Sequence, residues 1–507
     1  MERCDVNLPD GWVKTDLATV IVLMRNGLVA LQEKGPVGIP ISRIETISLG
    51  VIDFNRVRYV KNINEEKKQQ YLLQLGDILF SHINSDLHLG KTAVYDSSKA
   101  LLHGMNLLLI RPNQNCIIAK YLNYFLKHCR SVGKFISIAQ HAVNQSSLNQ
   151  RKLEKFPIRI APLAEQKRIV DKIERLFSYL DEGERLLEQV QKQLSTYRQA
   201  VLKAAVIGEL TKEWRAENRD KVESGKKLLQ RVLEERRKSW QGRGKYNEPV
   251  APDASSLPEL PEGWTWTSVD SLICSGPTNG ISPKISENSL GGVPSFKLSA
   301  TTRGEFLITN ETIKNIDLEP DKAEKYWLSS GDLLVQRGNS IEYVGTAALF
   351  PGPDRTYVYP DLMMKVRPVQ SVLGQWMTFC INSRYGKNYM QKKATGTAGS
   401  MPKINGDALR YLPIPLPSLD EIEKLIQVLA SLQSYCSNHE KEAQLSLRRI
   451  DHLRQSILKS AFSGELVDQN PNDEPASELL VRIQEEQKQA KAPNPRSGRT
   501  SKRSASV

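Results

Sequence analysis

The chain contains two copies of one helix-like segment, and this repetition constrains its fold more than any other feature. RQAVLKAAVIGEL begins at Arg198, and RQSILKSAFSGEL begins at Arg454, 256 residues later, with eight of thirteen positions identical. LPDGW ending at Trp12 likewise returns as LPEGW ending at Trp264, a shift of 252. A period this long is not that of a solenoid repeat. It indicates duplication of a two-part unit, in the order globular, helical, globular, helical.

The helical parts show a heptad pattern. Apolar residues at alternating steps of four and three predict a coiled-coil seam rather than one face of a globular helix. Each helix is expected to stop at a glycine, Gly208 or Gly464. Two unrelated core helices are the alternative, but the matched register and ending favour two helices that pack on each other. The predicted seam consists of Ile169, Ile173, Leu176, Leu180, Leu187, Val190, Leu194, Tyr197 and Val201 in the first helix, and of Leu425, Leu429, Leu432, Ile450, Leu453 and Ile457 in the second.

The globular parts consist of short strands and turns with a helix or two. GDILFS from Gly76 and GDLLVQ from Gly331 are each a turn followed by a strand. We therefore expect a mixed α/β fold with two similar strand-rich domains. The expected boundaries are a first domain at 1–162, a long helix at 163–211, a basic linker at 212–259, a second domain at 260–418, a long helix at 419–467 and a basic tail at 468–507.

The net charge of +13 fits a polyanionic partner. However, residues 212–245 and 491–507 together account for 11 of these charges, and both segments have the composition of a mobile linker or tail. A solubilising tail would have the same composition, so charge alone does not establish nucleic-acid binding. The longest apolar run near the N-terminus, LATVIVLM, stops at Arg25, which predicts neither a signal peptide nor a membrane span and favours a cytoplasmic protein.

Motifs of catalysis and metal binding are not evident in the sequence. The six cysteines form no C-x-x-C pair, and the seven histidines have no ligand spacing, so we expect no metal site. SDLHLGKT, from Ser85 to Thr92, ends like a phosphate-binding loop but has a serine where the first glycine must be. Asp77 and Asp332 recur in both halves, and their places beside glycine and before a strand are typical of turn formers. We expect a chain without a catalytic site.

The order of these parts resembles the specificity subunit of type I restriction-modification systems. The resemblance spans almost the whole chain. It rests on LPDGW and LPEGW, on PLAEQKRIVDKIERLF at 162–177, and on RQAVLKAAVIGELTKEW and RQSILKSAFSGEL. The second half departs from PLAEQ, because PSLDEIEKL places Ile422 where the first half has Gln166. Contacts made by Gln166 are therefore not expected in the second half.

The resemblance implies two target recognition domains held apart by two long antiparallel coiled-coil helices, in a pseudo-twofold arrangement. Each domain would read one half of an asymmetric bipartite site in double-stranded DNA. Two modification (methyltransferase) subunits would dock on the helices, and restriction (motor-nuclease) subunits would join the complex. S-adenosylmethionine, ATP and Mg are then expected in the partner subunits, with no cofactor in this chain. A structural coiled-coil adaptor that binds proteins through its globular ends is the alternative, and a nuclease is disfavoured.

Polar loops that occupy equivalent places in the two halves are the candidates for DNA contacts, because arginine or lysine pairs with guanine and asparagine or glutamine with adenine. A solvated loop side chain is the alternative for each single residue. The candidates of the first half are Ser81, His82, Asn84, Ser85, Lys91, His141, Asn144, Gln145 and Ser146. Those of the second half are Gln336, Arg337, Asn339, Ser340, Tyr343, Lys393, Thr397, Ser400 and Lys403.

Overall fold

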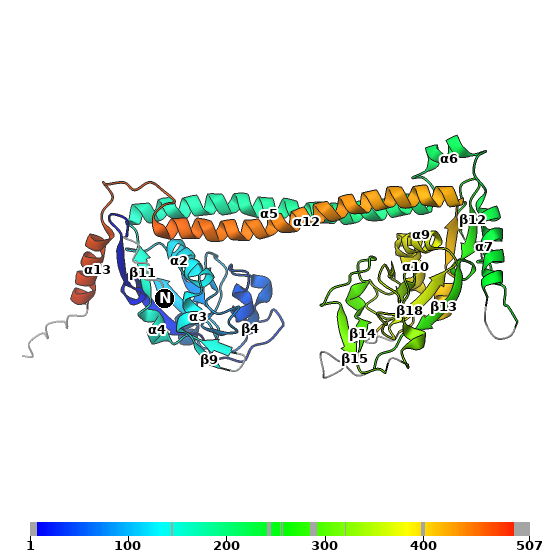
Figure 1. Ribbon diagram of the computed structural model, residues 1–507. Coiled ribbons are helices and arrows are strands. Elements are labelled where there is room, and N and C mark those ends of the chain that lie inside the picture. The colour runs from blue at the N-terminus through cyan, green and yellow to red at the C-terminus, as the bar shows by residue number, and fades with distance from the viewer. Residues whose placement is uncertain are drawn as a thin grey trace, which may run out of the picture. The chain divides into compact units, whose positions relative to one another are not determined.

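The computed structural model describes residues 8–142, 145–240, 245–253, 255, 257–283, 292–319, 321–396 and 401–490. Two long helices, α5 (Leu163–Val206) and α12 (Leu419–Ser463), contribute to both of its compact units. Unit 1 comprises Met1–Leu187 and Leu445–Val507, and unit 2 comprises Glu188–Gln444. Each unit thus contains one globular domain and part of each long helix (Figure 1). Unit 1 holds the first part of α5 and the last part of α12, and unit 2 holds the remainder of both helices.

Unit 1 is built on a four-stranded antiparallel sheet with the order β2 (Ile21–Asn26), β8 (Leu108–Pro112), β5 (Ile78–Phe80), β7 (Thr92–Val94). Successive side chains of a strand point to opposite faces. Ile78 and Phe80 accordingly pack in the core with α2 (Ala119–Ser131) and the long helices, while Leu79 packs in a second cluster on the other face. Burial on both faces explains why GDILF is apolar without alternation.

The other elements of unit 1 surround this sheet. β1 (Val13–Asp16) pairs with β11 (Pro157–Ile160), and β3 (Ile39–Ile41) with β4 (Arg58–Val60). β6 (Ile83–Asn84), β10 (Gln145–Ser147) and β9 (Gln140–Ala142) form a three-stranded sheet. Short helices are α1 (Glu65–Tyr71), α3 (Lys134–Ile138) and α4 (Gln150–Glu154), with 3-10 turns at Leu17–Val20, Ile44–Ile47 and Phe54–Arg56.

Unit 2 repeats the architecture. Its four-stranded sheet has the order β13 (Ile273–Asn279), β18 (Met363–Pro368), β16 (Leu333–Gln336), β17 (Ala347–Leu349), and α9 (Ser371–Asn382) takes the place of α2. β12 (Thr265–Ser268) pairs with β19 (Pro413–Leu416), and β14 (Val293–Phe296) with β15 (Ile313–Ile316). Short helices are α6 (Lys212–Asn218), α8 (Val269–Leu272), α10 (Arg384–Lys393) and α11 (Gly406–Arg410), with 3-10 turns at Leu298–Ala300 and Glu324–Tyr326. The predicted mixed α/β fold with two similar domains is confirmed.

The recurring glycine–aspartate turn is anchored by an arginine in both units. Asp77 accepts two hydrogen bonds from the guanidinium of Arg111, at 2.7 and 2.8 Å, and a third from the backbone of Gln74. Asp332 accepts the equivalent pair from Arg367, at 2.7 and 3.0 Å. These contacts raise the pKa of both arginines. Both aspartates therefore act in the scaffold, as turn formers tied to the neighbouring strand.

The long helices pack antiparallel to each other within each unit, as predicted. In unit 1, Arg454 of α12 pairs with Asp181 and Glu184 of α5, at 2.6 and 2.8 Å. In unit 2, Arg198 of α5 lies 3.4 Å from Glu440 of α12. The closing glycines adopt the left-handed conformation, with φ of +74° at Gly208 and +80° at Gly464, which ends each helix.

The residues of the predicted seam are buried to different degrees, because a single partner helix covers only part of an apolar stripe. Ile169, Ile173, Leu425, Leu429 and Ile450 are buried, Leu176, Leu180, Leu187, Leu194, Val201, Leu432 and Ile457 are half-buried, and Val190, Tyr197 and Leu453 are exposed. The side chains of these last three residues are therefore not fully covered by the partner helix.

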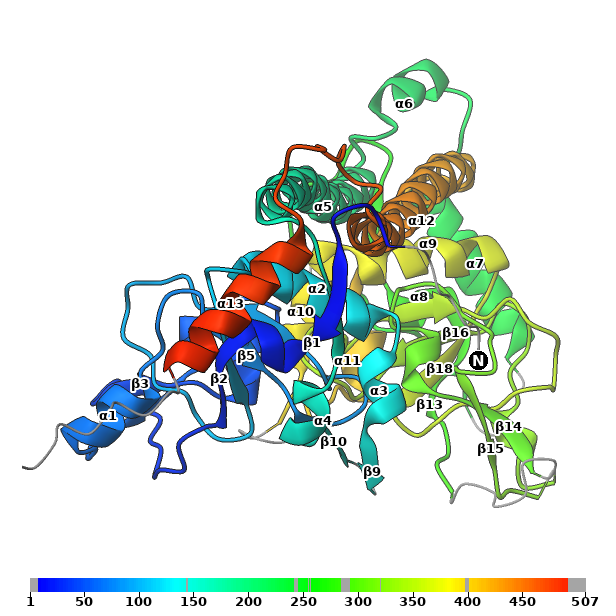
Figure 2. The ribbon, with the colours of Figure 1, turned by 90° about the vertical axis from the view of Figure 1, so that its left-hand side faces the viewer.

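The expectation of a mobile linker and tail is wrong for two helices. α7 (Gly225–Ser239) buries Leu228 and Val232 in the core of unit 2, and α13 (Ala476–Ala490) buries Leu479 and Ile483 in the core of unit 1. Both segments are amphipathic, with apolar residues four apart, so each covers its domain while its charged face meets solvent. Figure 2 shows α13 beside β1. The basic end of the tail, 491–507, lies outside the described residues.

Candidate nucleic-acid interface

The two candidate loops of the first half lie side by side in unit 1. β6, from the first loop, pairs with β10, from the second, so that Asn84 faces Ser146. The backbone N–H of Leu148 donates to the carbonyl of His82 at 2.8 Å just beyond this pairing. About sixty residues separate the loops in sequence, yet their strands form one three-stranded sheet.

Unit 2 joins its two loops in the same way. Gly338 forms an antiparallel bridge with Lys403, which also bridges Thr395. The N–H of Ile404 donates to the carbonyl of Arg337 at 2.9 Å. The sequence predicted both loops as candidates, and the structure brings them together in each unit.

The two equivalent asparagines stabilise these loops internally. The Nδ2 of Asn84 donates to Ser81 Oγ at 3.3 Å, and its Oδ1 accepts from the N–H of Ser85 at 2.9 Å. The Nδ2 of Asn339 donates to Gln336 Oε1 at 2.7 Å, and its Oδ1 accepts from the N–H of Ser340, also at 2.7 Å. Both ends of each amide are therefore engaged within the loop, which gives these residues a structural role in the free chain.

Three further candidates are turned into the protein. Ser81 and Gln336 are buried, and the Nε2 of Gln336 donates to the carbonyl of Leu298 at 3.0 Å and to Thr301 Oγ1 at 2.9 Å. His82 is also buried, and desolvation lowers its pKa to about 4, so its imidazole is neutral at neutral pH. In this structure these side chains do not face solvent, and a contact to DNA through them would require rearrangement.

Lys91 likewise points inward. Its ammonium donates to the carbonyl of Ser48 at 2.7 Å. Partial burial, and the nearby charge of Arg130, lower its pKa. The residue lies at the end of the hairpin that joins β5 and β7, and its charge is used on the backbone rather than presented to a phosphate.

The exposed candidates of unit 1 surround a small polar network. Ser85, His141 and Gln145 are exposed, whereas Ser146 is buried beneath them. The Ser146 hydroxyl donates to Asp86, and His141 Nδ1 lies 2.8 Å from Ser146 Oγ. Since the serine proton is used on the carboxylate, the imidazole must donate through Nδ1. Asp86, which no sequence motif marks, thereby positions a predicted contact residue.

Unit 2 presents a more basic surface. Ser340, Tyr343, Lys393 and Lys403 are exposed, and Arg337 is half-buried. Arg337 and Lys403 line an open groove of about 410 Å³ between the two loops. The candidates Asn144, Thr397 and Ser400 lie outside the described residues.

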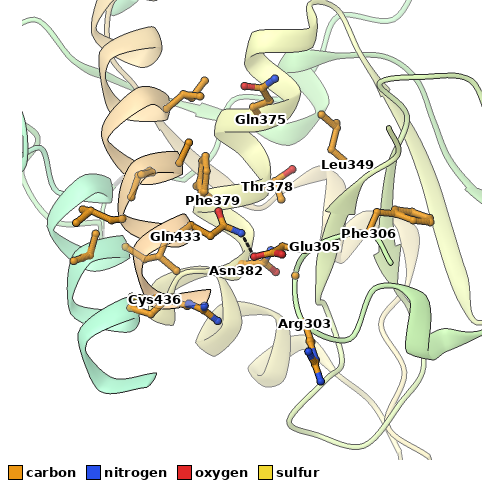
Figure 3. A pocket seen from close by; sticks show the side chains of 18 of the residues that line it. Arg303, Glu305, Phe306, Leu349, Gln375, Thr378, Phe379, Asn382, Gln433 and Cys436 are labelled. Carbon is orange, nitrogen blue, oxygen red and sulfur yellow. Dashed lines mark hydrogen bonds between the residues drawn. The ribbon is translucent and has the colours of Figure 1, made fainter. Parts of the chain in front are cut away.

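A separate cavity of about 330 Å³ lies within unit 2 between the long helices and the domain. It is lined largely by apolar side chains, among them Leu349 and Phe379, and Gln433 of α12 donates a hydrogen bond to Glu305 beside it (Figure 3). The Asn382 amide in its wall is occupied by both backbone groups of Ala347, at 3.0 and 2.7 Å. This apolar lining does not resemble the polar loop surfaces.

The described residues show neither a cluster of metal-ligand side chains nor a helix suited to span a membrane. Among them, no three histidine, cysteine, aspartate or glutamate side chains gather as metal ligands. No helix in this part of the chain is both long and apolar enough to cross a membrane.

Known proteins are similar in sequence to this duplicated chain. Residues 9–192 match the family described as type I restriction modification DNA specificity domain. The chain is 26% identical to the type I restriction enzyme EcoKI specificity subunit of Escherichia coli over 94% of its own length and 96% of that subunit. It is 40% identical to the MjaX specificity subunit of Methanocaldococcus jannaschii over 218 residues, which span 51% of that relative.

The fold has a solved counterpart. A structure described as the basis of complex assembly and conformational transition of the type I R-M system aligns with a TM-score of 0.61 at 18% identity, over 90% of this chain and 99% of the other. That likeness concerns the fold. The domain match and the nearly full-length similarity to EcoKI show that the chain is similar to the specificity subunits of type I restriction-modification systems.

Proposed function

We propose that the chain is the DNA-binding specificity subunit of a type I restriction-modification complex and recognises an asymmetric bipartite sequence. One observation supports this most directly. Two equivalent scaffolds each join two distant loops into one polar surface, by the β6–β10 pairing in unit 1 and the Gly338–Lys403 bridge in unit 2. A repeated frame with differing exposed side chains is what two readers of different half-sites require.

The two surfaces differ in the bases that they suit. Unit 1 exposes Ser85, His141 and Gln145, and unit 2 exposes Lys393 and Lys403 beside Arg337. Basic side chains pair with guanine or phosphate, whereas glutamine pairs with adenine. The half-sites are therefore expected to differ in sequence.

The partners and cofactors belong to the same proposal. The chain acts in the cytoplasm without catalysing a reaction, and it directs two modification (methyltransferase) subunits, which hold S-adenosylmethionine, to the site. Restriction subunits that use ATP and Mg complete the complex. Exposed apolar side chains on α5, Tyr179 and Leu186 in unit 1 and Val190 and Tyr197 in unit 2, support docking of protein partners on the helices.

Reconstitution tests this proposal. The chain is combined with the methyltransferase subunit encoded beside it, and adenine methylation is mapped across genomic DNA. A split, asymmetric motif is expected. Absent or random methylation would defeat the proposal, and stable protein complexes without DNA specificity would favour the adaptor alternative.

Exchange of one domain tests the two-reader arrangement. Residues 13–155 are replaced by the equivalent segment of a relative with another specificity. One half of the methylated motif should change while the other half stays the same. A change in both halves would show that the domains do not read independently.

A further inference from the structure

Arg337 is held from both sides at the mouth of the unit 2 groove. Its backbone N–H donates to the carbonyl of Leu362 at 2.8 Å, and its carbonyl accepts from the N–H of Ile404 at 2.9 Å. The first contact joins it to the turn before β18, and the second joins it to the other candidate loop. The backbone position is therefore fixed by two segments remote in sequence.

Its guanidinium is anchored at one end only. Nε donates to the carbonyl of Ile404 at 3.3 Å, which orients the plane and directs the two Nη groups away from that carbonyl. The groove beside it is lined by Arg337, Thr395, Gly396, Met401, Lys403, Ile404 and Asn405, a set without a carboxylate. An oriented guanidinium beside a groove whose described lining includes no acidic side chain suits a ligand with two adjacent acceptors.

DNA offers such a pair in the major groove, where guanine presents O6 and N7 side by side. A planar guanidinium matches two acceptors at once, whereas an ammonium such as that of Lys403 acts as a point charge. Anchoring through Nε also lowers the conformational entropy lost on binding. We propose that Arg337 reads a guanine in the second half-site, through its two Nη groups; this inference rests on the proposed function.

The first half has no arginine at the equivalent position, so it cannot make the same guanine contact. The residue equivalent to Arg337, 255 positions earlier, is His82. It is only 8% exposed, and Ser81 beside it and Ser146 of the second loop are buried as well. The guanine contact is therefore specific to the second half-site and contributes to its difference from the first.

Substitutions at Arg337 test the inference in the complete complex with its methyltransferase subunits. Arg337→Ala should relax one position of the second half-site, with a loss of discrimination of roughly 10-fold or more. Arg337→Lys keeps the charge and should lose the same discrimination, and Arg337→Gln should shift that position toward adenine. Arg237→Ala removes an equal charge from α7, away from the loops, and should leave the motif unchanged.

The possible outcomes distinguish failure of the proposed Arg337 contact from failure of the proposed function. If Arg337→Ala weakens binding to all sequences equally and Arg337→Lys restores it, the residue contacts a phosphate and the inference fails. An unchanged second half-site in both variants overturns it as well, as does a position that is not guanine in the wild type. A wild-type complex without any motif would instead refute the proposed function itself. Methylation of the unaltered first half-site reports that each variant is folded and assembled.

Discussion

The indole nitrogen of Trp12 donates a hydrogen bond to the carboxylate of Glu165 at 3.0 Å, and this contact joins two of the repeated sequence motifs. Trp12 closes LPDGW, and Glu165 lies in PLAEQ at the start of α5. Trp264 and Glu421 repeat the contact in unit 2 at 2.9 Å. The motifs recur because each unit needs the same joint between a domain and a long helix.

Trp12→Phe should destabilise unit 1 more than Trp264→Phe destabilises unit 2. Glu165 is only 1% exposed, so Trp12→Phe leaves a buried acceptor without its donor, at a cost of about 1–3 kcal/mol. In unit 2, Glu421 keeps hydrogen bonds from Thr211 and Arg215 at 2.6 and 3.0 Å after Trp264→Phe. Urea unfolding, monitored by hydrogen exchange in peptides from each unit, measures the loss of stability in both variants. Equal losses would show that the additional partners of Glu421 do not matter.

The closing glycine of α12 contacts the same joint. A Cβ added to Gly464 would lie 2.2 Å from Cγ of Pro9, in the LPDGW motif, and φ there is +80°. Gly464→Ala should therefore destabilise unit 1 by about 1–3 kcal/mol through overpacking, beyond the backbone strain. Gly133→Ala is the matched control, because Gly133 has φ of +75° and no neighbour within 4 Å of the added carbon. Similar urea midpoints for the two variants would contradict the packing argument.

The sequence predicted those structural features that leave a periodic pattern, either the heptad spacing of the helices or the duplication of the whole unit. Heptad spacing predicted α5 and α12 and their pairing, and the shift of 252–256 residues predicted two similar domains. Gly208 and Gly464 were predicted as helix ends because a left-handed terminal residue favours glycine. Gln166 accepts from the N–H of Ile118 and donates to the carbonyls of Cys116 and Ala161, and Ile422 in unit 2 is simply buried, as that substitution implied.

The sequence could not separate loop residues that face solvent from those that support the loop. Asn84 and Asn339 are polar, equivalent and near the surface, yet both amide ends are hydrogen-bonded within the loop. Gln336 is buried by contacts with residues about 35 positions away, which no local pattern reveals. The charge of the 212–245 segment likewise obscured α7, whose two buried apolar positions decide its packing.

Acidification should destabilise unit 1 selectively. Burial lowers the pKa of His82, His103 and His128 to about 4, so the unfolded chain binds more protons than the folded unit below pH 6.5. Stability is therefore fully present above about pH 6.5 and falls as the pH drops toward 4. Unit 2 contains one histidine, His439, which is half-buried.

The difference in pH dependence between the two units is measured from their urea midpoints between about pH 7.5 and pH 4.5, with hydrogen exchange as the probe of unfolding. His103→Gln removes one titrating group while keeping a donor for the carbonyl of Leu107, which lies 3.0 Å from His103 Nε2. This variant should show a shallower loss of unit 1 stability on acidification. A parallel decline of both units, unaffected by the substitution, would assign the effect to other groups.

Apolar side chains on the solvent face of α5 should mediate assembly with the modification subunits. Tyr179 and Leu186 are 69% and 47% exposed, and their seven-residue spacing places them on one face of the helix. Tyr179→Asp together with Leu186→Asp should leave folding intact, because neither side chain is buried, and should weaken association with the methyltransferase subunit at least 10-fold in sedimentation or calorimetry. Ser195→Asp together with Gln199→Asp, at two exposed positions on another face of the same helix, is the charge-matched control and should bind normally. Normal association of the double variant would place the partner elsewhere on the chain.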